Sequence, residues 1–259
     1  MQLVRAGGEQ FEIEQSGSGP DLLLLHSLLT DPGSFSAIVP ALSRSRRMTL
    51  VSLPGFGRST AGGPSIEDSA DRLAQLVATL GEKPDVLGNG YGGSIAVALA
   101  ARHGARVGKL VLADTAAAFP EAGRAPFRAM AEAVDRNGMA AIVDVAVRRI
   151  FPESYLAAHP GAIAQRREVL LRANPANFAA ACRALTKLDL RPELPRIRNP
   201  TLVVVGTLDA ATPPVLAHEL VSGIPEARLI EMPTCGHCPP LQQPAEFVAA
   251  IAPFLALEH

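Results

Sequence analysis

The sequence has little of several features that mark particular classes of protein. It contains only three cysteines in 259 residues, and an odd count in a chain of this size argues against a disulfide framework. No apolar run approaches the roughly 20 residues needed to cross a bilayer. The formal net charge is only −1, which gives no attraction to nucleic acid or to an anionic membrane surface. We therefore expect neither nucleic acid nor a membrane among its partners.

The two ends of the sequence predict where the protein works and which residues to set aside. Residues 1–5 lack the charged-then-apolar pattern of a signal peptide, so we expect a cytoplasmic protein. Hydrophobic residues make up 48% and charged residues 19%, as in a globular domain, and one core is the default at this length. Residues 257–259 look like the start of a vector-encoded polyhistidine tag, and we exclude them from functional reasoning.

Buried strands alternate with helices over most of the chain. Residues 22–25 are a continuous apolar run bounded by turn residues, a pattern typical of a strand buried on both faces of a parallel sheet. The same signal recurs at 48–53, 84–88, 109–113 and 201–206. The clearest helix is expected over 65–80, where Ser65 and Asp68 form a capping box and Gly81 follows the last turn. This alternation predicts a doubly wound, mostly parallel α/β sheet with helices on both faces.

Two segments depart from that alternation. Apolar and acidic residues alternate at 11–14, and a turn at 17–20 follows, which predicts a first antiparallel hairpin. From about 116 to 198 no buried strand is expected, and helices are broken at Gly138, Pro152, Pro160 and Pro175. We therefore expect a core of residues 1–115 and 199–256 with an inserted helical cap of residues 116–198.

A glycine-rich turn follows the strand at 84–88. Residues 88–93 read Gly-Asn-Gly-Tyr-Gly-Gly, which matches the nucleophile elbow G-x-S-x-G in every part except the serine, replaced by Gly90. Glycine at the apex accepts a positive φ without steric cost, so the turn should still form. Taken alone, the motif is weak evidence, because a glycine-rich turn before a helix is also typical of phosphate binding.

Two later residues favour the elbow interpretation. Asp209 follows the strand at 201–206, and His237 opens a loop about one strand and helix further on. Nucleophile position, acid and histidine in that order, each just past a strand, are the arrangement of the α/β-hydrolase fold. We therefore assign Asp209 and His237 as acid and base, with Gly90 at the nucleophile position.

The remaining site predictions concern the loop at 26–29 and the cap. The backbone N–H groups of Leu28 and Tyr91 are the expected oxyanion-hole donors, and they do not depend on a serine side chain. His26 and Ser27 are expected to contact the substrate. Arginines at 124, 128, 148, 149, 166, 167 and 183 crowd the cap. We select Arg128 to bind a substrate carboxylate, with Phe151 as a further contact.

Three other residues allow different interpretations. Cys235 and Cys238 form a C-x-x-C, but no second cysteine pair exists and the histidine between them is already assigned, so we expect neither metal nor other cofactor. Cys235 is a candidate replacement nucleophile, although its place beside the base disfavours a productive angle of attack. Asp114 is an alternative acid, but a loop-capping aspartate is the commoner role and Asp209 fits better.

The same motifs resemble those of a known family. His26-Ser27-Leu28 with Thr30-Asp31, Asp114-Thr115-Ala116-Ala117, and Gly206-Thr207-Leu208-Asp209 with Thr212-Pro213-Pro214 are similar to 3-oxoadipate enol-lactonases. The cap segments around Gly138, Phe178 and Asp189 are similar too, so the resemblance covers roughly residues 10–256. It implies a carboxylic-ester hydrolase that opens a small enol-lactone through an acyl-serine intermediate. This chain departs from the pattern at Gly90 and Leu29 and has no tryptophan, and without a serine at position 90 that mechanism does not carry over.

Three hypotheses follow for the function. The first is an esterase or lactonase in which the serine was replaced, by engineering or by loss in one lineage. The second is a serine-independent enzyme that uses His237 and Asp209 to activate water or move a proton on an enolisable substrate. The third is a non-catalytic protein that binds a small ligand under the cap. All three predict a small molecule with a carbonyl group as partner, and they leave the oligomeric state open, a homodimer included.

Overall fold

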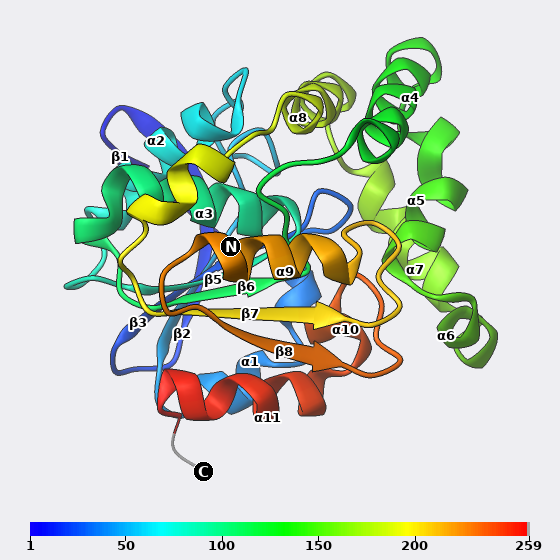
Figure 1. Ribbon diagram of the computed structural model, residues 1–259. Coiled ribbons are helices and arrows are strands. Elements are labelled where there is room, and N and C mark those ends of the chain that lie inside the picture. Colours follow the sequence, from blue (N-terminus) through cyan, green and yellow to red (C-terminus); the bar gives the residue numbers. More distant parts are fainter. Residues whose placement is uncertain (258–259) are drawn as a thin grey trace.

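The structure is a computed structural model that describes residues 1–257; the expected tag residues at 258 and 259 lie outside the described part. Its centre is an eight-stranded sheet in the order β1-β2-β4-β3-β5-β6-β7-β8 (Figure 1). The strands are β1 (Gln2–Ala6), β2 (Glu9–Ser16), β3 (Asp21–Leu25), β4 (Arg47–Val51), β5 (Asp85–Asn89), β6 (Leu110–Ala113), β7 (Thr201–Gly206) and β8 (Arg228–Met232). β2 runs antiparallel to both β1 and β4, and all other pairs are parallel.

Helices cover both faces of the sheet because its central strands are apolar on both sides. In β3, Leu22 and Leu24 pack into one hydrophobic cluster, and Leu23 and Leu25 pack into another on the opposite face. The first face carries α1 (Val39–Leu42) and α11 (Pro244–Leu255). The second carries α2 (Ile66–Val77), α3 (Tyr91–His103) and α9 (Pro214–Gly223) (Figure 1). The predicted mostly parallel α/β sheet is confirmed.

The segment between β6 and β7 is helical. It comprises α4 (Glu121–Asn137), α5 (Val143–Ile150), α6 (Glu153–Ala158), α7 (Ala162–Leu171) and α8 (Pro175–Thr186), and it lies beyond the carboxyl ends of the strands (Figure 1). The chain leaves a helix at Gly138 and enters new ones at Pro152 and Pro175, as expected from residues that end or begin helices. The remaining short helices are α10 (Pro239–Gln242), η1 (Pro32–Phe35), η2 (Gly104–Arg106), η3 (Met139–Ile142) and η4 (Arg191–Arg196).

The predicted first hairpin is wrong in its turn. The antiparallel hairpin consists of β1 and β2, joined at Gly7 and Gly8, which both have positive φ. The turn at 17–20 instead leads into β3, which lies between β4 and β5 and does not pair with β2. The alternation at 11–14 predicts the half-exposed strand β2 but not its partner. Alternating residues indicate that one face of a strand is exposed, and they do not say which neighbouring strand pairs with it.

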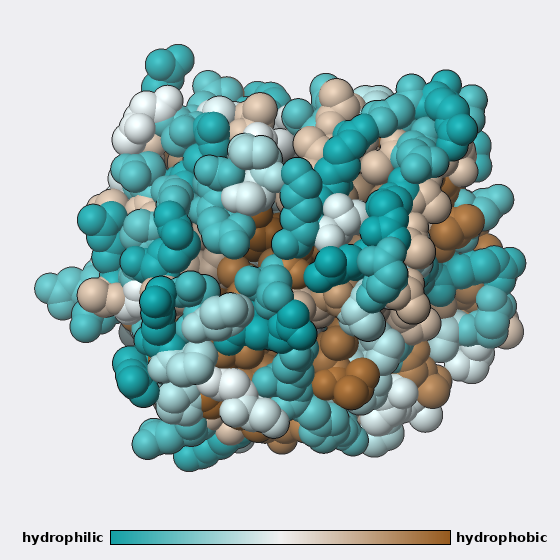
Figure 2. Space-filling model, turned by 45° about the horizontal axis from the view of Figure 1, so that its top comes forward, coloured by the Kyte–Doolittle hydropathy of each residue, from teal (hydrophilic) through white to brown (hydrophobic). Residues whose placement is uncertain are grey.

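The face of the molecule that lies above the sheet in Figure 1 is largely hydrophilic. Figure 2 shows polar residues over most of one face, with apolar residues in separate small groups. Within residues 1–257, no helix has the length and the apolar character required of a membrane span.

Candidate active site

The elbow forms with glycine at its apex. Gly90 joins β5 to α3 with φ 55° and ψ −115°, a strained conformation for other residues. The flanking glycines are required by close packing: a Cβ on Gly92 would lie 2.3 Å from the carbonyl oxygen of Leu25, and one on Gly88 2.6 Å from that of Gly92. The backbone of the elbow therefore depends on its small neighbours, and it keeps its shape without a side chain at position 90.

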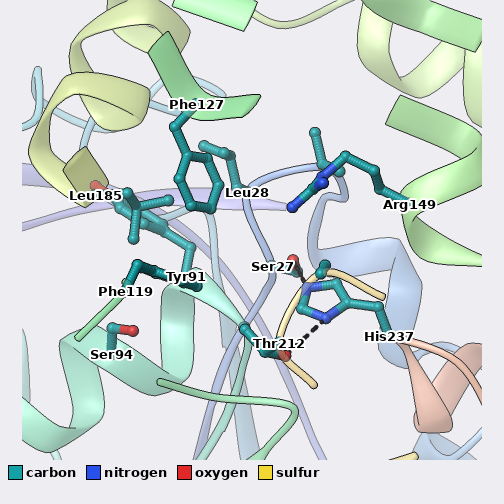
Figure 3. Close-up of a pocket in the computed structure, with 13 residues that line it drawn as sticks. Ser27, Leu28, Tyr91, Ser94, Phe119, Phe127, Arg149, Leu185, Thr212 and His237 are labelled. Atoms are coloured by element: carbon teal, nitrogen blue, oxygen red, sulfur yellow. Dashed lines mark hydrogen bonds between the residues drawn. The ribbon is translucent and has the colours of Figure 1, made fainter. Parts of the chain in front are cut away.

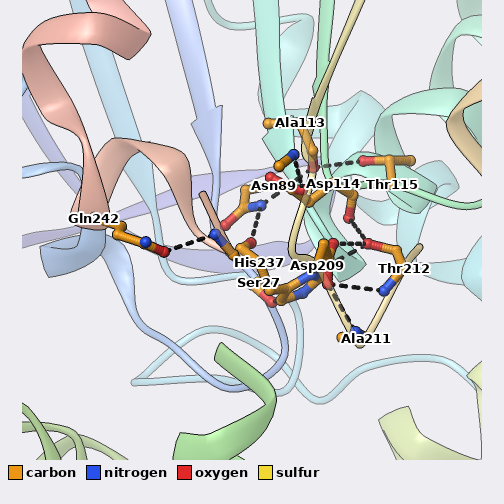
Figure 4. Close-up of polar contacts among 12 residues, drawn as sticks. Ser27, Asn89, Ala113, Asp114, Thr115, Asp209, Ala211, Thr212, His237 and Gln242 are labelled. Atoms are coloured by element: carbon orange, nitrogen blue, oxygen red, sulfur yellow. Dashed lines mark hydrogen bonds and ion pairs between the residues drawn. The ribbon is translucent and has the colours of Figure 1, made fainter. Parts of the chain in front are cut away.

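Asp209 and His237 meet beside this elbow (Figure 4). The imidazole Nδ1 lies 2.9 Å from Asp209 Oδ2, and both residues are buried. Asp209 also accepts hydrogen bonds from the N–H groups of Ala211 and Thr212 and from the Thr212 hydroxyl. Burial raises the pKa of the Asp209 carboxyl, but His237 and side-chain hydrogen bonds, that of the Thr212 hydroxyl among them, outweigh it and bring that pKa down to about 2. A charged Asp209 holds the imidazole with Nε2 free to accept a proton.

The backbone of His237 is held from two directions. Its carbonyl oxygen accepts a hydrogen bond of 3.0 Å from the Asn89 side chain, which comes from the elbow strand β5. Its N–H donates to the carbonyl of Ile150 at the end of α5, at 2.9 Å. The base is thus tied both to the sheet and to the cap, which limits its motion during a proton transfer.

Asp114 lies next to this pair but has a different role. Its Oδ1 accepts the N–H of Gly206 at 2.9 Å, so it caps the loop after β7, while its Oδ2 is buried with no partner among residues 1–257. Burial and the charge of Asp209 raise the pKa of Asp114 well above its usual value. Asp114, Asp209 and His237 offer ligand atoms within 4.8 Å of one another. In this group Asp209 and His237 are hydrogen-bonded to each other, and Asp114 is hydrogen-bonded to the N–H of Gly206.

The two expected oxyanion-hole donors come from the loop at 26–29, hereafter the oxyanion loop, and from the first residue of α3. Leu28 and Tyr91 are buried and line the same cavity as Gly90 and His237. Neither backbone N–H donates a hydrogen bond to another group within residues 1–257. Unpaired N–H groups on residues that line one cavity are what an oxyanion hole requires, so the assignment of Leu28 and Tyr91 as its donors stays a prediction.

His26 does not line the cavity, contrary to the expected substrate contact. The buried ring bridges two backbone segments: Nδ1 donates to the Ser27 carbonyl at 2.8 Å, and Nε2 accepts the N–H of Leu53 at 3.2 Å. Burial lowers the pKa of His26 to about 4, so the ring stays neutral and can make both bonds. His26 shapes the loop that presents Ser27 and Leu28.

The cavity lies between the strand ends and the cap (Figure 3). Its walls are mainly apolar, with a few polar groups converging on one side. The lining residues are Ser27, Leu28, Leu29, Gly90, Tyr91, Ser94, Phe119, Phe127, Arg149, Leu185, Ala211, Thr212 and His237. Such a mixture is typical of a site for a small molecule.

The cap cation in this cavity is Arg149, not Arg128. Arg128 is exposed on α4 and pairs with Glu121, and it does not line the cavity. Arg149 reaches from α5 toward Ser27 and His237 (Figure 3), and its guanidinium carbon lies 5.7 Å from the centre of the Phe127 ring. It makes no ion pair with any residue of 1–257. The spacing of apolar residues could have indicated Arg149. It lies seven residues after Ile142 and three after Ala146, both buried, and this spacing places it on the apolar side of α5.

Phe151 and the cysteines also lie outside the cavity. Phe151 is buried and stacks on Tyr155 with ring centres 4.6 Å apart, while Phe119 and Phe127 form the aromatic wall instead. Cys235 and Cys238 are buried free thiols. Burial raises the pKa of Cys235, and that of Cys238 to about 12, so neither is a ready nucleophile at neutral pH.

Comparison with known proteins agrees with this fold. The model of the alpha/beta hydrolase family matches residues 22–250. The chain belongs to this family. It is 31% identical to a pimeloyl-[acyl-carrier protein] methyl ester esterase of Nitrosomonas europaea, over 92% of this chain and 96% of the relative. It is 28% identical to 3-oxoadipate enol-lactonase 1 of Acinetobacter baylyi, over 98% and 96%. The crystal structure of the enol-lactonase from Burkholderia xenovorans LB400 superposes with a TM-score of 0.90 at 30% identity, covering 98% of this chain and all (100%) of that one.

Proposed function

We propose that this protein hydrolyses the ester or lactone bond of a small substrate that carries a carboxylate. The observation that carries the proposal is the buried His237–Asp209 pair, whose free imidazole nitrogen Nε2 faces the apex of the elbow. An imidazole oriented by a charged carboxylate takes a proton from an oxygen nucleophile as that oxygen attacks a carbonyl carbon. Relatives of this chain named as esterases and enol-lactonases support the same bond type.

The cavity supports the assignment of the substrate. The N–H groups of Leu28 and Tyr91 are free to bind the carbonyl oxygen as it becomes negative. Arg149 supplies a cation with no anionic partner within residues 1–257, and a guanidinium binds a carboxylate in a bidentate manner. The apolar wall of Phe119, Phe127 and Leu185 suits the carbon chain between the two groups.

The test measures hydrolysis of esters that differ in charge. The probes are 4-nitrophenyl acetate, monomethyl glutarate and dimethyl glutarate, assayed with the wild type and with His237→Ala. We expect the wild type to prefer the monomethyl ester to the dimethyl ester in kcat/KM. We expect His237→Ala to lower kcat by about 10³-fold, because removing one member of a catalytic unit removes most of its effect.

The same assay separates hydrolysis from simple binding. A wild type no faster than His237→Ala on every ester would overturn the proposal. If calorimetry then showed binding of the monomethyl ester without turnover, the absence of a side chain at Gly90 would favour a ligand-binding protein instead.

A further inference from the structure

Ser27 stands where the base can reach it. Its Oγ lies 3.2 Å from His237 Nε2, the nitrogen not used by Asp209 (Figure 3). The residue is buried, and its side chain lines the cavity. Within residues 1–257, the Ser27 hydroxyl has no other hydrogen-bond partner. Ser27, His237 and Asp209 therefore form one continuous line of hydrogen bonds.

That hydroxyl lies close to where the oxygen of an elbow serine would lie. A Cβ built on Gly90 would lie 2.7 Å from His237 Nε2 and also 2.7 Å from Ser27 Oγ. Because a serine oxygen sits only about one bond length beyond its Cβ, a hydroxyl at position 90 and that of Ser27 would compete for the same space. With glycine at the elbow, the base has a hydroxyl beside it from the oxyanion loop.

The backbone of Ser27 is fixed by its neighbours. Its carbonyl accepts hydrogen bonds from His26 Nδ1 at 2.8 Å and from the N–H and the hydroxyl of Thr30, both at 3.2 Å. A side chain on a backbone held at this many points loses little freedom when it reacts, which lowers the entropic cost of attack.

We propose that Ser27 is the nucleophile of this enzyme, acting in a triad of Ser27, His237 and Asp209. This assignment rests on the proposed hydrolysis of esters or lactones. Ser27 Oγ bonds to the carbonyl carbon while its proton passes to His237 Nε2. The carbonyl oxygen becomes negative and accepts hydrogen bonds from the N–H groups of Leu28 and Tyr91.

The second half of the reaction uses the same groups. The bond from the carbonyl carbon to the leaving oxygen breaks, and His237 returns its proton to that oxygen, which leaves an ester on Ser27. Water then gives a proton to His237 and attacks that ester, and Ser27 recovers its proton as the acid is released. Ester and water are consumed, acid and alcohol are formed, and no other reactant is needed.

The direct test is covalent labelling of the wild type, which does not depend on whether any variant folds. An alkyl fluorophosphonate phosphonylates an activated serine with loss of fluoride, and peptide mass spectrometry locates the adduct. We expect one adduct, on Ser27, and none in His237→Ala. An adduct on another residue, or an unlabelled wild type, overturns the proposal.

Kinetics give a second, independent readout. With 4-nitrophenyl acetate we expect a burst equal to the enzyme concentration, since an acyl-enzyme accumulates, and we expect Ser27→Ala to lower kcat by about 10³-fold. The matched control is Ser34→Ala, a buried serine away from the cavity whose hydroxyl has no partner within residues 1–257. Ser34→Ala should keep both burst and rate. Hydrolysis by Ser27→Ala within tenfold of the wild type, with no burst in either, would show that His237 activates water and that Ser27 only orients the imidazole.

A double variant tests the shared position of the two hydroxyls. Ser27→Ala with Gly90→Ser removes the competing oxygen and supplies one from the elbow, so activity should rise at least tenfold above Ser27→Ala and the label should move to position 90. A wild type that hydrolyses no ester yet is labelled on Ser27 in a His237-dependent way would refute the proposed function and leave Ser27 as the activated serine. Failure of the proposed hydrolysis and failure of the assignment of Ser27 as the nucleophile therefore give different results.

Discussion

The strand ends and the cap both contribute to the cavity, but they hold their residues in different ways. At the strand ends, Asp209 and His237 follow β7 and β8 within a few residues, and the elbow is fixed by backbone crowding at Gly88 and Gly92. In the cap, Arg149 reaches the cavity only because of how α5 is rotated on its neighbours. The place of a residue that follows a strand closely is fixed by the sheet and can be predicted from the sequence. The place of a residue on a cap helix depends on how the whole cap packs.

The largest difference is expected between the two neighbouring acids at the strand ends. Asp209→Asn should lower kcat by about 10⁴-fold, because the amide can no longer hold the imidazole in the correct tautomer. Asp114→Asn should leave kcat within about threefold, because the amide oxygen of asparagine can still accept the hydrogen bond from the N–H of Gly206. Steady-state kinetics on 4-nitrophenyl acetate checks both. Equal losses in the two variants would mean that the pair works as a unit and that Asp114 is part of the acid.

The next largest effect compares two glycines for stability. Gly92→Ala should lower the free energy of unfolding by about 3 kcal/mol, because its Cβ would meet the carbonyl oxygen of Leu25 at 2.3 Å and backbone must shift. Gly161→Ala in the cap, where a Cβ meets nothing described within 4 Å and φ is −77°, should raise it by about 0.5 kcal/mol. Urea denaturation measures both. A Gly92→Ala protein as stable as the wild type would refute the crowding argument.

A smaller effect separates the two cap arginines. Arg149→Met keeps an unbranched side chain but removes the cation. It should raise KM for monomethyl glutarate by about 10- to 100-fold, because this is the size of effect expected when a charge-assisted hydrogen bond to a carboxylate is lost. KM for 4-nitrophenyl acetate should not change. Arg128→Met, the matched exposed variant, should change neither value. If Arg128→Met impaired the monomethyl ester instead, the cap would have to be packed differently in solution.

The difference between the strand ends and the cap also explains which features could be predicted from the sequence. The parallel sheet, the elbow at Gly90 and the pairing of Asp209 with His237 followed from motifs in which a few residues force one backbone path. The substrate contacts expected at Arg128 and Phe151 lie outside the cavity. The cap has many arginines on its helices, and only tertiary packing selects the one that reaches the cavity. Ser27 was placed in the site by its loop, but its distance to His237 depends on two segments 210 residues apart.

The cap shares a single apolar interior with the sheet. One hydrophobic cluster runs from β3 and β5 through α3 into cap residues such as Phe127, Val147 and Phe178, and the N–H of His237 is bonded to Ile150. A region joined to its neighbour by buried contacts does not melt as a separate cooperative unit. Cap and sheet should therefore protect their amide hydrogens from exchange together.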